Sequence, residues 1–431
     1  MEDEAFDAIV VGGGVAGCVT AYQLAQAGHS VALIERGAEP GAKNLSGGVF
    51  YCRIMEEVFP DFVNRAPVER RITRNCISML NGSSFVNLDY WDARLAEPVN
   101  AVSVLRAKLD AWLAEQCEAA GVAVLPGVRV DALLRDGDQV TGVRADEDDL
   151  AGRIVILADG VNSFLAQEAG IRAKEPARHL AVGIKSVISI PSSKLEERFQ
   201  LAPGEGAAYA VVGDCTRGVA GGGFLYTNGE SVSAGVVLRL DDLEASGFAA
   251  SEIHDHFLGH PMVSRMLEGG SLLEYGSHLT IEAGPQMVTH DLTRPGLMIV
   301  GDAAGFTLNT GFTIRGMDLA AGSGIAAARA AHAALVESDF SQAAMDRYRT
   351  ELAATFVGRD MRTYAKAPSF FESPALYRDA GLLAADVLHG IFDLDTTPRT
   401  RLTAVFRRAV ARSRLGWGSL ASLMITAVRS L

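Results

Sequence analysis

The N-terminal segment has the hydrophobic pattern of a strand, a helix and a second strand. Phe6–Val11 is an apolar run that ends at three consecutive glycines. From Val15 onward, apolar residues at helical spacing predict a helix that ends at Gly28, and Ser30–Glu35 predicts a second buried strand. A strand–helix–strand unit of this kind is typical of a parallel sheet.

Hydrophobic patterns that predict helices and strands continue to residue 336. Leu105–Ala120 predicts a helix with one apolar face, and Leu297–Gly301 predicts a buried strand before a long helix from about Gly316 to Val336. Between about 180 and 285 apolar and polar residues alternate, which favours an antiparallel sheet. Further strands are predicted at Val122–Leu125, Val128–Leu134, Val140–Ala145, Arg153–Ala158, Ala181–Ile190, Gly206–Val212, Gly223–Tyr226 and Ser231–Leu238.

These patterns together predict an α/β protein in four segments. Residues 1–178 and 289–338 are the two parts of a Rossmann-like nucleotide-binding domain. Residues 179–288 are expected to form an inserted domain built on an antiparallel sheet. Residues 339–431 are a helical C-terminal region with a basic tail.

Composition narrows the functional classes. The chain has 431 residues, 48% hydrophobic and 21% charged, which excludes a disordered protein. The net charge of −13 argues against nucleic-acid binding, which depends on Lys and Arg. Five cysteines without a C-x-x-C pair indicate reduced thiols. Because the acidic start at 1–4 is unlike a secretory signal, we expect a cytoplasmic protein.

The first chemical motif is Gly12-x-Gly14-x-x-Gly17, with Val15 and Ala16 inside it and Glu35 at the end of the next strand. The glycines allow a tight turn and let a helix N-terminus approach a pyrophosphate, and the carboxylate can accept hydrogen bonds from a ribose. We interpret the motif as a dinucleotide-binding site. It does not distinguish NAD from FAD.

Two later motifs favour FAD. Leu297–Gly305 is an apolar strand that ends in Gly-Asp, so Asp302 can bind the ribityl hydroxyls of a flavin. The Gly311–Gly316 turn leads into a helix whose N-terminus would stabilise negative charge on the isoalloxazine ring. Ala158-Asp159-Gly160-x-x-Ser163 stands between the two. An isolated Asp-Gly is usually a turn, but three motifs in this order are far more specific than one.

The order of these motifs resembles the glutathione-reductase-type FAD fold. Finer segments resemble the FixC branch of the electron-transfer-flavoprotein–quinone oxidoreductase family, and the resemblance covers nearly the whole chain. It implies FAD as cofactor and transfer of electrons from a reduced electron-transfer flavoprotein to a quinone or a ferredoxin-like acceptor. The segments that carry it are 41–48, 221–228, 274–284 and 305–318.

The resemblance also implies which residues bind FAD. The glycine motif and the residues after the second strand would hold the ADP part, two loops and a helix start would line the middle, and the turn after the last strand would hold the flavin. These residues are Gly12, Gly14, Val15, Ala16, Gly17, Glu35, Arg36 and Val130 for ADP; Lys43, Ser46, Gly47 and Arg106 for the middle; Ala158, Asp159 and Gly160 from the Asp-Gly motif; and Asp302, Gly311, Phe312 and Thr313 for the flavin.

The C-terminus departs from the long quinone oxidoreductases, which carry four clustered cysteines in a ferredoxin-like part. Here no cysteine follows Cys215, so no [4Fe–4S] cluster can form, and the resemblance to FixC implies a separate small ferredoxin. Residues 399–431 contain seven Arg and no Asp or Glu, with an apolar stripe from Leu402 to Val410. This tail would suit an acidic ferredoxin or an anionic membrane surface, or it is a helix packed on the body with solvated arginines.

Other residues give weaker signals. His254, His256 and His260 lie close together, but no acidic or Cys partner completes a metal-binding pattern, so we expect a solvated helix and no metal site. Three aromatic residues of the predicted inserted sheet are candidates for a substrate pocket, although strand aromatics are usually core. They are Tyr209, Phe224 and Tyr226. No catalytic residue stands out, which is consistent with electron transfer.

Two other functions stay open, because the same fold serves many reactions. One is an FAD-dependent dehydrogenase or oxidase that acts on a small metabolite or a carrier-bound intermediate of a biosynthetic pathway. The other is a non-catalytic flavoprotein partner in a complex. The rates at which the reduced flavin reacts with a quinone and with oxygen would separate electron transfer from an oxidase.

Overall fold

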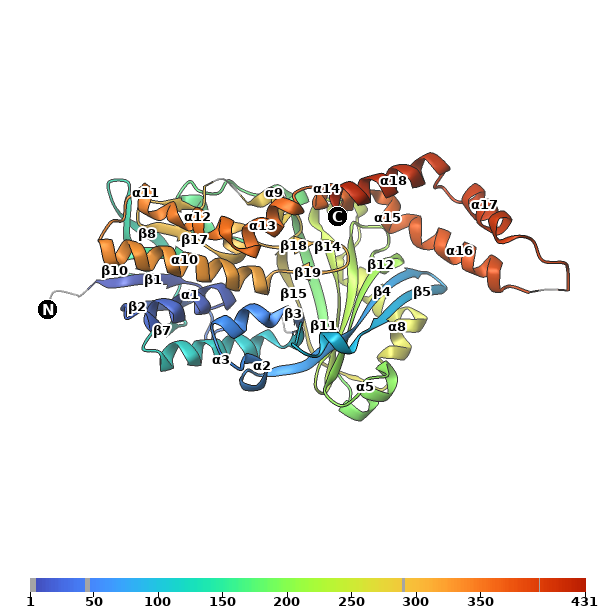
Figure 1. Ribbon diagram of the computed structural model, residues 1–431, viewed down its shortest axis with the longest axis horizontal. Coiled ribbons are helices and arrows are strands. Elements are labelled where there is room, and N and C mark those ends of the chain that lie inside the picture. The colour runs from blue at the N-terminus through green and yellow to red at the C-terminus, as the bar shows by residue number, and fades with distance from the viewer. Residues whose placement is uncertain (1–4, 43–46, 289–290, 395) are drawn as a thin grey trace.

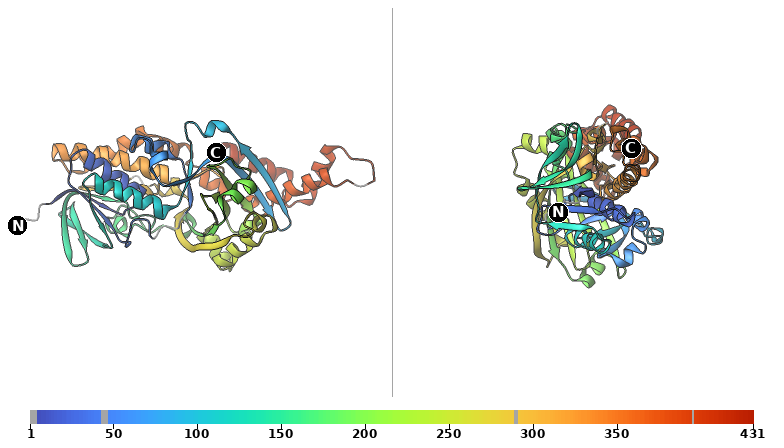
Figure 2. Two further views of the ribbon diagram at one scale, coloured as in Figure 1. Left: turned by 90° about the horizontal axis from the view of Figure 1, so that it is seen from below. Right: turned by 90° about the vertical axis from the view of Figure 1, so that its left-hand side faces the viewer.

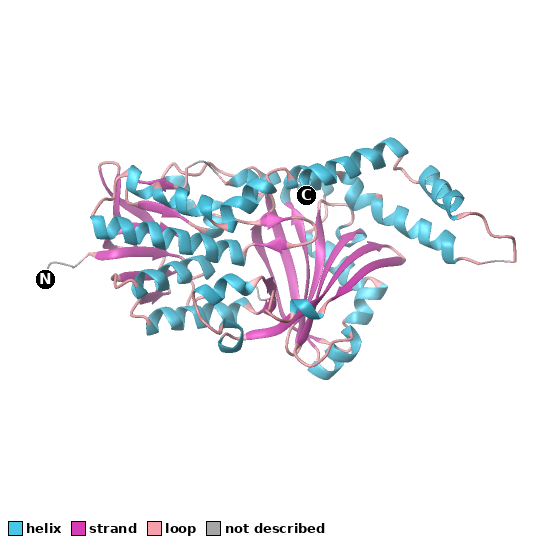
Figure 3. Cartoon of the chain, in the orientation of Figure 1, coloured by secondary structure: helices cyan, strands magenta, loops and turns pink. Residues whose placement is uncertain are grey.

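The computed structural model describes residues 5–42, 47–288, 291–394 and 396–431. Figure 1 shows three parts along its long axis: a first lobe that contains the N-terminus, a central lobe built on a large sheet, and an arm that extends beyond it. The strands gather in the first two parts, and the arm is formed by helices and their loops (Figure 3).

The first lobe contains an eight-stranded sheet with a parallel centre. Its strands are β1 (Phe6–Val11), β2 (Val31–Glu35), β7 (Ala123–Pro126), β8 (Val130–Asp136), β9 (Gln139–Ala145), β10 (Asp148–Leu157), β16 (Thr293–Arg294) and β17 (Leu297–Ile299). The order is β16-β17-β10-β1-β2-β7, and β9 joins β8 to the start of β10. The central strands are apolar because both faces of the sheet are covered.

Three helices pack together on one side of this sheet: α1 (Val15–Gln26), α3 (Arg106–Ala119) and α10 (Met317–Glu337). Figure 2 shows them on the side opposite the ribbon of β8 and β9. Within the described residues, α10 is long and apolar enough to cross a membrane, but 78% of that stretch is buried inside the protein. It is the core helix of the first lobe.

The central lobe contains a nine-stranded sheet in the order β15-β11-β14-β13-β12-β4-β6-β3, with β5 beside β4. The strands are β3 (Gly48–Phe50), β4 (Val68–Asn81), β5 (Ser84–Trp91), β6 (Val102–Val104), β11 (Leu180–Ser189), β12 (Glu205–Gly213), β13 (Gly221–Thr227), β14 (Ser231–Arg239) and β15 (Ser271–Ile281).

Two features of this sheet differ from the sequence-based expectation. Four of its strands come from residues 48–104, which the sequence pattern assigns to the nucleotide-binding domain, and β12 pairs with β4 in parallel. The sheet is therefore mixed rather than antiparallel. The difference arises because β4 crosses from one lobe to the other and supplies the edge on which β12 pairs.

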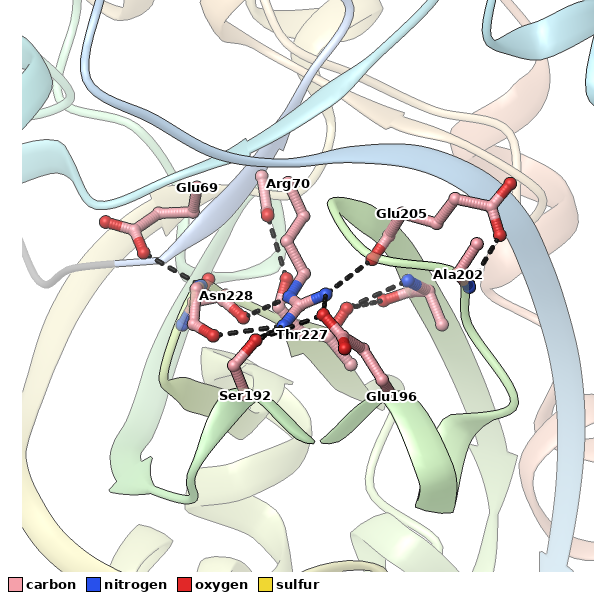
Figure 4. A network of polar contacts seen from close by, with 11 residues as sticks. Glu69, Arg70, Ser192, Glu196, Ala202, Glu205, Thr227 and Asn228 are labelled. Carbon is pink, nitrogen blue, oxygen red and sulfur yellow. Dashed lines mark hydrogen bonds and ion pairs between the residues drawn. The ribbon is translucent and has the colours of Figure 1, made fainter. Parts of the chain in front are cut away.

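One face of the central sheet is covered by α5 (Ser192–Phe199), α7 (Ala250–Gly259) and α8 (Pro261–Met266), which share a hydrophobic core with it. Arg70 of β4 lies inside this lobe and is 3% exposed. Its guanidinium donates hydrogen bonds to the carbonyl oxygens of Glu205 and Asn228 and to the Ser192 hydroxyl, and pairs with Glu196 (Figure 4). This network joins β4 to α5 and to the ends of β12 and β13, because a buried Arg needs partners for all its donors.

The C-terminal region is helical, as predicted. Its first helices pack on α10, and the last three form the arm, whose own core is small: Leu383, Ala409, Val410 and Leu415. The helices are α11 (Gln342–Met345), α12 (Arg347–Ala354), α13 (Phe356–Thr363), α14 (Ala367–Phe371), α15 (Pro374–Arg378), α16 (Ala380–Phe392), α17 (Leu402–Arg412) and α18 (Trp417–Ser430). Short elements elsewhere are α2 (Phe62–Arg65), α4 (Phe164–Glu168), α6 (Leu240–Ser246), α9 (Gly284–Met287), β18 (Leu308–Asn309) and β19 (Ile314–Arg315).

Candidate functional site

Four sequence motifs meet at one edge of the first sheet. The strands β2, β1, β10 and β17 are parallel neighbours in this order, so their carboxyl ends lie side by side. Glu35 ends β2, the glycine motif follows β1, Asp159 follows β10 and Asp302 follows β17. Residues far apart in the chain thus lie in one row along this edge. We call Glu35, the glycine motif, Asp159 and Asp302 the strand-end row.

Two glycines of the first motif, Gly12 and Gly17, are required by close backbone contacts. A Cβ on Gly12 would lie 2.3 Å from the carbonyl oxygen of Ala158, and a Cβ on Gly17 would lie 1.9 Å from that of Gly12. α1 begins after Gly14, and no described side chain caps it. Its first N–H groups can therefore bind an anion. Val15 and Ala16 are buried in its first turn.

Glu35 lies beside the glycine loop. Its Oε2 accepts a hydrogen bond from the Gly13 N–H at 2.9 Å, and its Oε1 accepts one from the Gly37 N–H at 2.6 Å. These bonds hold the carboxylate in place and leave it free to accept from a ribose, since a carboxylate has about four acceptor sites. Arg36 is exposed, and Val130 is half-buried at the start of β8.

A buried ion pair lies across from the glycine loop. Arg106, the first residue of α3, donates to both carboxylate oxygens of Asp110 at 2.8 and 2.7 Å. The Asp110 side chain is fully buried, whereas 24% of the Arg106 side chain stays exposed. A Cβ on Gly14 would lie 3.5 Å from Nη2 of Arg106, so this guanidinium faces the loop. A guanidinium in this position suits a diphosphate.

Two further carboxyl groups continue the row. Burial raises the pKa of Asp302, while Arg106 and Arg172 act in the opposite direction. Burial also raises the pKa of Asp159 to about 6, although the Ser163 hydroxyl donates a 2.8 Å hydrogen bond to it. Carboxyl groups with shifted pKa values beside specific cations are typical of functional sites.

The region after Asp302 is shaped as a small hairpin. Thr307 precedes β18, and its hydroxyl is buried without a hydrogen-bond partner among the described residues. A bound ligand could supply that partner. The tip at Gly311 has φ +76°, and a Cβ there would lie 2.9 Å from the ring of Phe371 on α14. Phe312 at the tip is 65% exposed, and Thr313 is half-buried.

One face of the central sheet closes the site. Lys185 of β11 donates a 3.0 Å hydrogen bond to the carbonyl oxygen of Gly47, and burial lowers its pKa to about 8. Phe224 lies on the same face, because it pairs with Gly235 and Gly235 pairs with Lys185. Its ring stacks on that of Tyr226 at 4.9 Å. The pair therefore occupies the side of the sheet on which the predicted cofactor residues lie.

The prediction that Tyr209 shares a pocket with these two aromatics is wrong. Tyr209 pairs with Leu225, the residue between Phe224 and Tyr226, and so points to the opposite face of the sheet. There it packs edge-on against Phe199 in the core under α5. A shift of one position along a strand reverses the face on which a side chain lies.

The prediction of a solvated histidine-bearing helix is also wrong. His254 is buried and lies 2.9 Å from the Ser186 hydroxyl, and His260 is buried beside the carbonyl oxygen of Asn81. His256 is partly exposed and contacts Asp214. Because α7 ends at Gly259, His260 lies outside the helix. Each of the three histidines thus has a polar partner within the central lobe.

Two residues of the site were not predicted. Arg172 was missed because an isolated arginine after a short helix has no distinctive spacing. Lys185 carried a usable signal, since it is the one charged residue in the otherwise uncharged run 180–190. Two predicted residues, Lys43 and Ser46, lie outside the described residues.

The residues present fit FAD. Glu35 suits the adenosine ribose, and the uncapped start of α1 with Arg106 suits the diphosphate. Asp159, Asp302 and the unpartnered Thr307 hydroxyl suit the ribityl chain and the flavin, which need hydrogen-bond partners. The fold and the site together define an FAD-dependent oxidoreductase.

Comparisons with known proteins agree with this class. A model of the FAD binding domain matches residues 5–201. A probable electron transfer flavoprotein-quinone oxidoreductase, YdiS of Escherichia coli, is 45% identical over 92% of this chain and 93% of its own. Protein FixC of Salmonella typhi is 42% identical over 92% of both chains. The chain therefore belongs to the family of FixC and electron transfer flavoprotein-quinone oxidoreductases, and it is an FAD-dependent oxidoreductase of electron transfer.

Solved structures show the same fold in distant proteins. A geranylgeranyl bacteriochlorophyll reductase-like protein of Thermoplasma acidophilum superposes with a TM-score of 0.72 at 21% identity, covering 98% of this chain and 99% of that chain. The myxobacterial halogenase CndH superposes with a TM-score of 0.62 at 19% identity, covering 99% of this chain and 91% of that chain. At these identities the likeness establishes the fold and not the reaction.

Proposed function

We propose that this protein accepts electrons from a reduced electron-transfer flavoprotein and passes them to a quinone or to a small ferredoxin. When bound, FAD supplies a centre that takes up two electrons and releases them singly or in pairs. The residues of the strand-end row hold it: Glu35, the glycine loop and Arg106 at the ADP side, and Asp159 and Asp302 toward the flavin. The names of the relatives at 42–45% identity support this assignment.

The observation that carries the quinone assignment is apolar surface around the hairpin at 308–315. Phe312 and Ile314 of this hairpin are 65% and 50% exposed. The hairpin contacts α14 through Phe371, and α14 packs on α18, which exposes Met424, Ile425 and Val428. Apolar surface beside the flavin end favours an acceptor that is itself apolar, as a quinone is.

The arm extends this apolar surface and adds positive charge. Leu402, Phe406 and Trp417 are exposed on α17 and α18, and residues 399–431 contain seven Arg and no acidic residue. Apolar side chains with arginines are typical of helices that lie at an anionic membrane surface. We propose that the protein is cytoplasmic and binds the membrane peripherally through the arm. The same arginines would receive an acidic ferredoxin.

For the fold, we propose the glutathione-reductase type with 179–288 as the inserted substrate domain between 1–178 and 289–338, followed by the helical region 339–431. It is supported by the first sheet, whose strands lie on both sides of 179–288 in the chain, at β10 and at β16–β17. Residues 48–104 add strands to the inserted sheet.

The donor is tested by anaerobic stopped-flow reduction of the bound FAD. Reduced electron-transfer flavoprotein should reduce it much faster than NADH or NADPH at the same concentration. Fast reduction by a nicotinamide and none by the flavoprotein would contradict the proposed donor. A matched mixture without protein measures direct reaction between the reagents.

A further inference from the structure

Arg172 is a buried cation at the floor of the strand-end row. It follows α4 in the chain and is only 5% exposed. A buried guanidinium is costly unless its donors are satisfied and its charge is opposed. The groups that Arg172 contacts therefore indicate its role.

The guanidinium joins two turns that carry predicted flavin ligands. Nη1 of Arg172 donates to the carbonyl oxygen of Val161 at 3.2 Å and to that of Ala303 at 2.9 Å. Val161 lies two residues after Asp159, and Ala303 directly follows Asp302. The strands that precede these turns, β10 and β17, are parallel neighbours. One side chain thus fixes the spacing between the two carboxyl groups.

The same guanidinium supplies charge to both carboxyl groups. It lowers the pKa of Asp159 and that of Asp302, against burial, which raises both. The other cations that act on them are Arg106 on Asp302 and Arg36 on Asp159. Opposing Arg172 is Glu175, whose Oε1 lies 3.8 Å from Nη2 and whose Oε2 lies 2.9 Å from Nδ1 of His179.

We propose that Arg172 is a positioning residue for FAD, which holds the Asp159 and Asp302 turns at a fixed separation and supplies positive charge beside their carboxyl groups, so that these groups accept hydrogen bonds from the ribityl chain. An ionised carboxylate accepts at both oxygens, whereas a protonated one presents a donor in place of an acceptor. Arg172 acts through these two residues and needs no contact with the cofactor.

The test compares two variants of the full chain after removal of FAD. Arg172→Gln keeps hydrogen-bond donors and loses the charge, and Arg172→Lys keeps the charge and loses the planar fork. Arg294→Met is the matched control, because Arg294 lies nearby, donates to the Gly170 carbonyl oxygen, and pairs with the exposed Asp291. The dissociation constant of FAD is measured by quenching of flavin fluorescence from pH 6 to pH 8.5, and circular dichroism checks folding.

Arg172→Gln should weaken FAD binding about 10-fold at pH 7, the effect of one charge-assisted contact, and the loss should grow as the pH falls. Arg172→Lys should recover most of the affinity with the wild-type pH profile, and Arg294→Met should bind as the wild type does. Equal losses in the Gln and Lys variants at every pH would show a merely structural role and overturn the proposal. Wild-type binding by the Gln variant would also overturn it.

A double-mutant cycle with Asp302→Asn gives a second measurement. If Arg172 acts through Asp302, Arg172→Gln should weaken FAD binding at least about 3-fold less in the Asp302→Asn background, because the charge it serves is already absent. Independent, additive losses would contradict that route.

Discussion

The first lobe buries its central strands and also the charged groups that support its site. Strands β1, β2 and β17 are buried, and Asp110 and Arg172 lie beneath the site with their partners. The arm has only a small core and exposes large apolar side chains, among them Leu402, Met424 and Val428. The arginines of 399–431 have no acidic neighbours in that segment. In the first lobe, FAD would occupy the site that these buried groups support. The arm presents a surface that only another molecule can cover.

The largest expected effect is in the glycine motif of the first lobe. Gly17→Val should abolish FAD binding, because even a Cβ would lie 1.9 Å from the Gly12 carbonyl oxygen. Absorbance of the bound flavin measures this. Gly259→Ala is the control, since nothing lies within 4 Å of a Cβ there, and it should bind FAD normally. A yellow Gly17→Val protein would break the account of the first lobe.

Asp302→Ala should weaken FAD binding about 10- to 100-fold, the usual effect of losing hydrogen bonds to a charged group. Fluorescence titration of the FAD-free protein measures the dissociation constant. Asp138→Ala, an exposed residue in the turn between β8 and β9, is the control. Unchanged affinity in the Asp302 variant would mean that the second flavin motif is misplaced.

Substitutions in the arm should weaken membrane binding and leave FAD binding unchanged. Replacement of Met424, Ile425 and Val428 by Ser should weaken sedimentation with anionic vesicles at least about 10-fold, because burial of each large apolar side chain contributes about 1.5–3 kcal/mol. FAD content should stay the same. Val336→Ser, which is equally exposed on the first lobe, is the control. Normal vesicle binding by the triple variant would remove the distinction between lobe and arm.

Deletion of 399–431 should separate membrane binding from cofactor binding. The truncated protein should keep its FAD and lose vesicle binding, since the deleted segment packs on the small arm core and on α14 and, among the described residues, not on the strands of the first lobe. If circular dichroism instead shows that the truncated protein is unfolded, residues 399–431 are needed for folding and the arm is not an independent binding surface.

A further expected effect is the pH dependence of stability in the FAD-free protein. The pKa of Asp159 is raised to about 6 by burial, so the folded state binds a proton more tightly than the unfolded state. This group therefore stabilises the fold below about pH 4, and its contribution, up to about 3 kcal/mol, is lost as the pH rises through 6. Asp159→Asn should remove that loss. Urea unfolding at pH 4.5 and 7 compares the two proteins, and parallel pH dependence in both would contradict the assignment.

Much of the first lobe could be predicted from sequence because its elements are local. Phe6–Val11, the helix from Val15 and the Asp302 strand end each have a short, self-contained pattern, and parallel pairing then aligns their carboxyl ends. The central sheet could not be predicted in the same way. β4 contains Glu69, Arg70, Arg71 and Arg74 among its apolar residues, so its alternation is hidden. Its parallel partner β12 lies more than a hundred residues later, and no local pattern gives that pairing.

Side-chain placement was predictable only where a motif fixes the backbone. Gly12 and Gly17 of the first motif are in place because a Cβ at either position would clash with a backbone carbonyl oxygen. Tyr209 was misplaced since the strand register decides its face, and Arg172 was missed since its partners are backbone carbonyls of distant turns. Such contacts depend on tertiary structure that a single sequence does not display.

We expect the reduced flavin of this protein to pass its electrons to a quinone. The most direct test reduces the bound FAD anaerobically and mixes the protein rapidly with a quinone analogue or with oxygenated buffer, following flavin absorbance. We expect fast reoxidation by the quinone and slow reaction with oxygen. Fast reaction with oxygen and slow reaction with the quinone would contradict it and would favour an oxidase that acts on a small molecule.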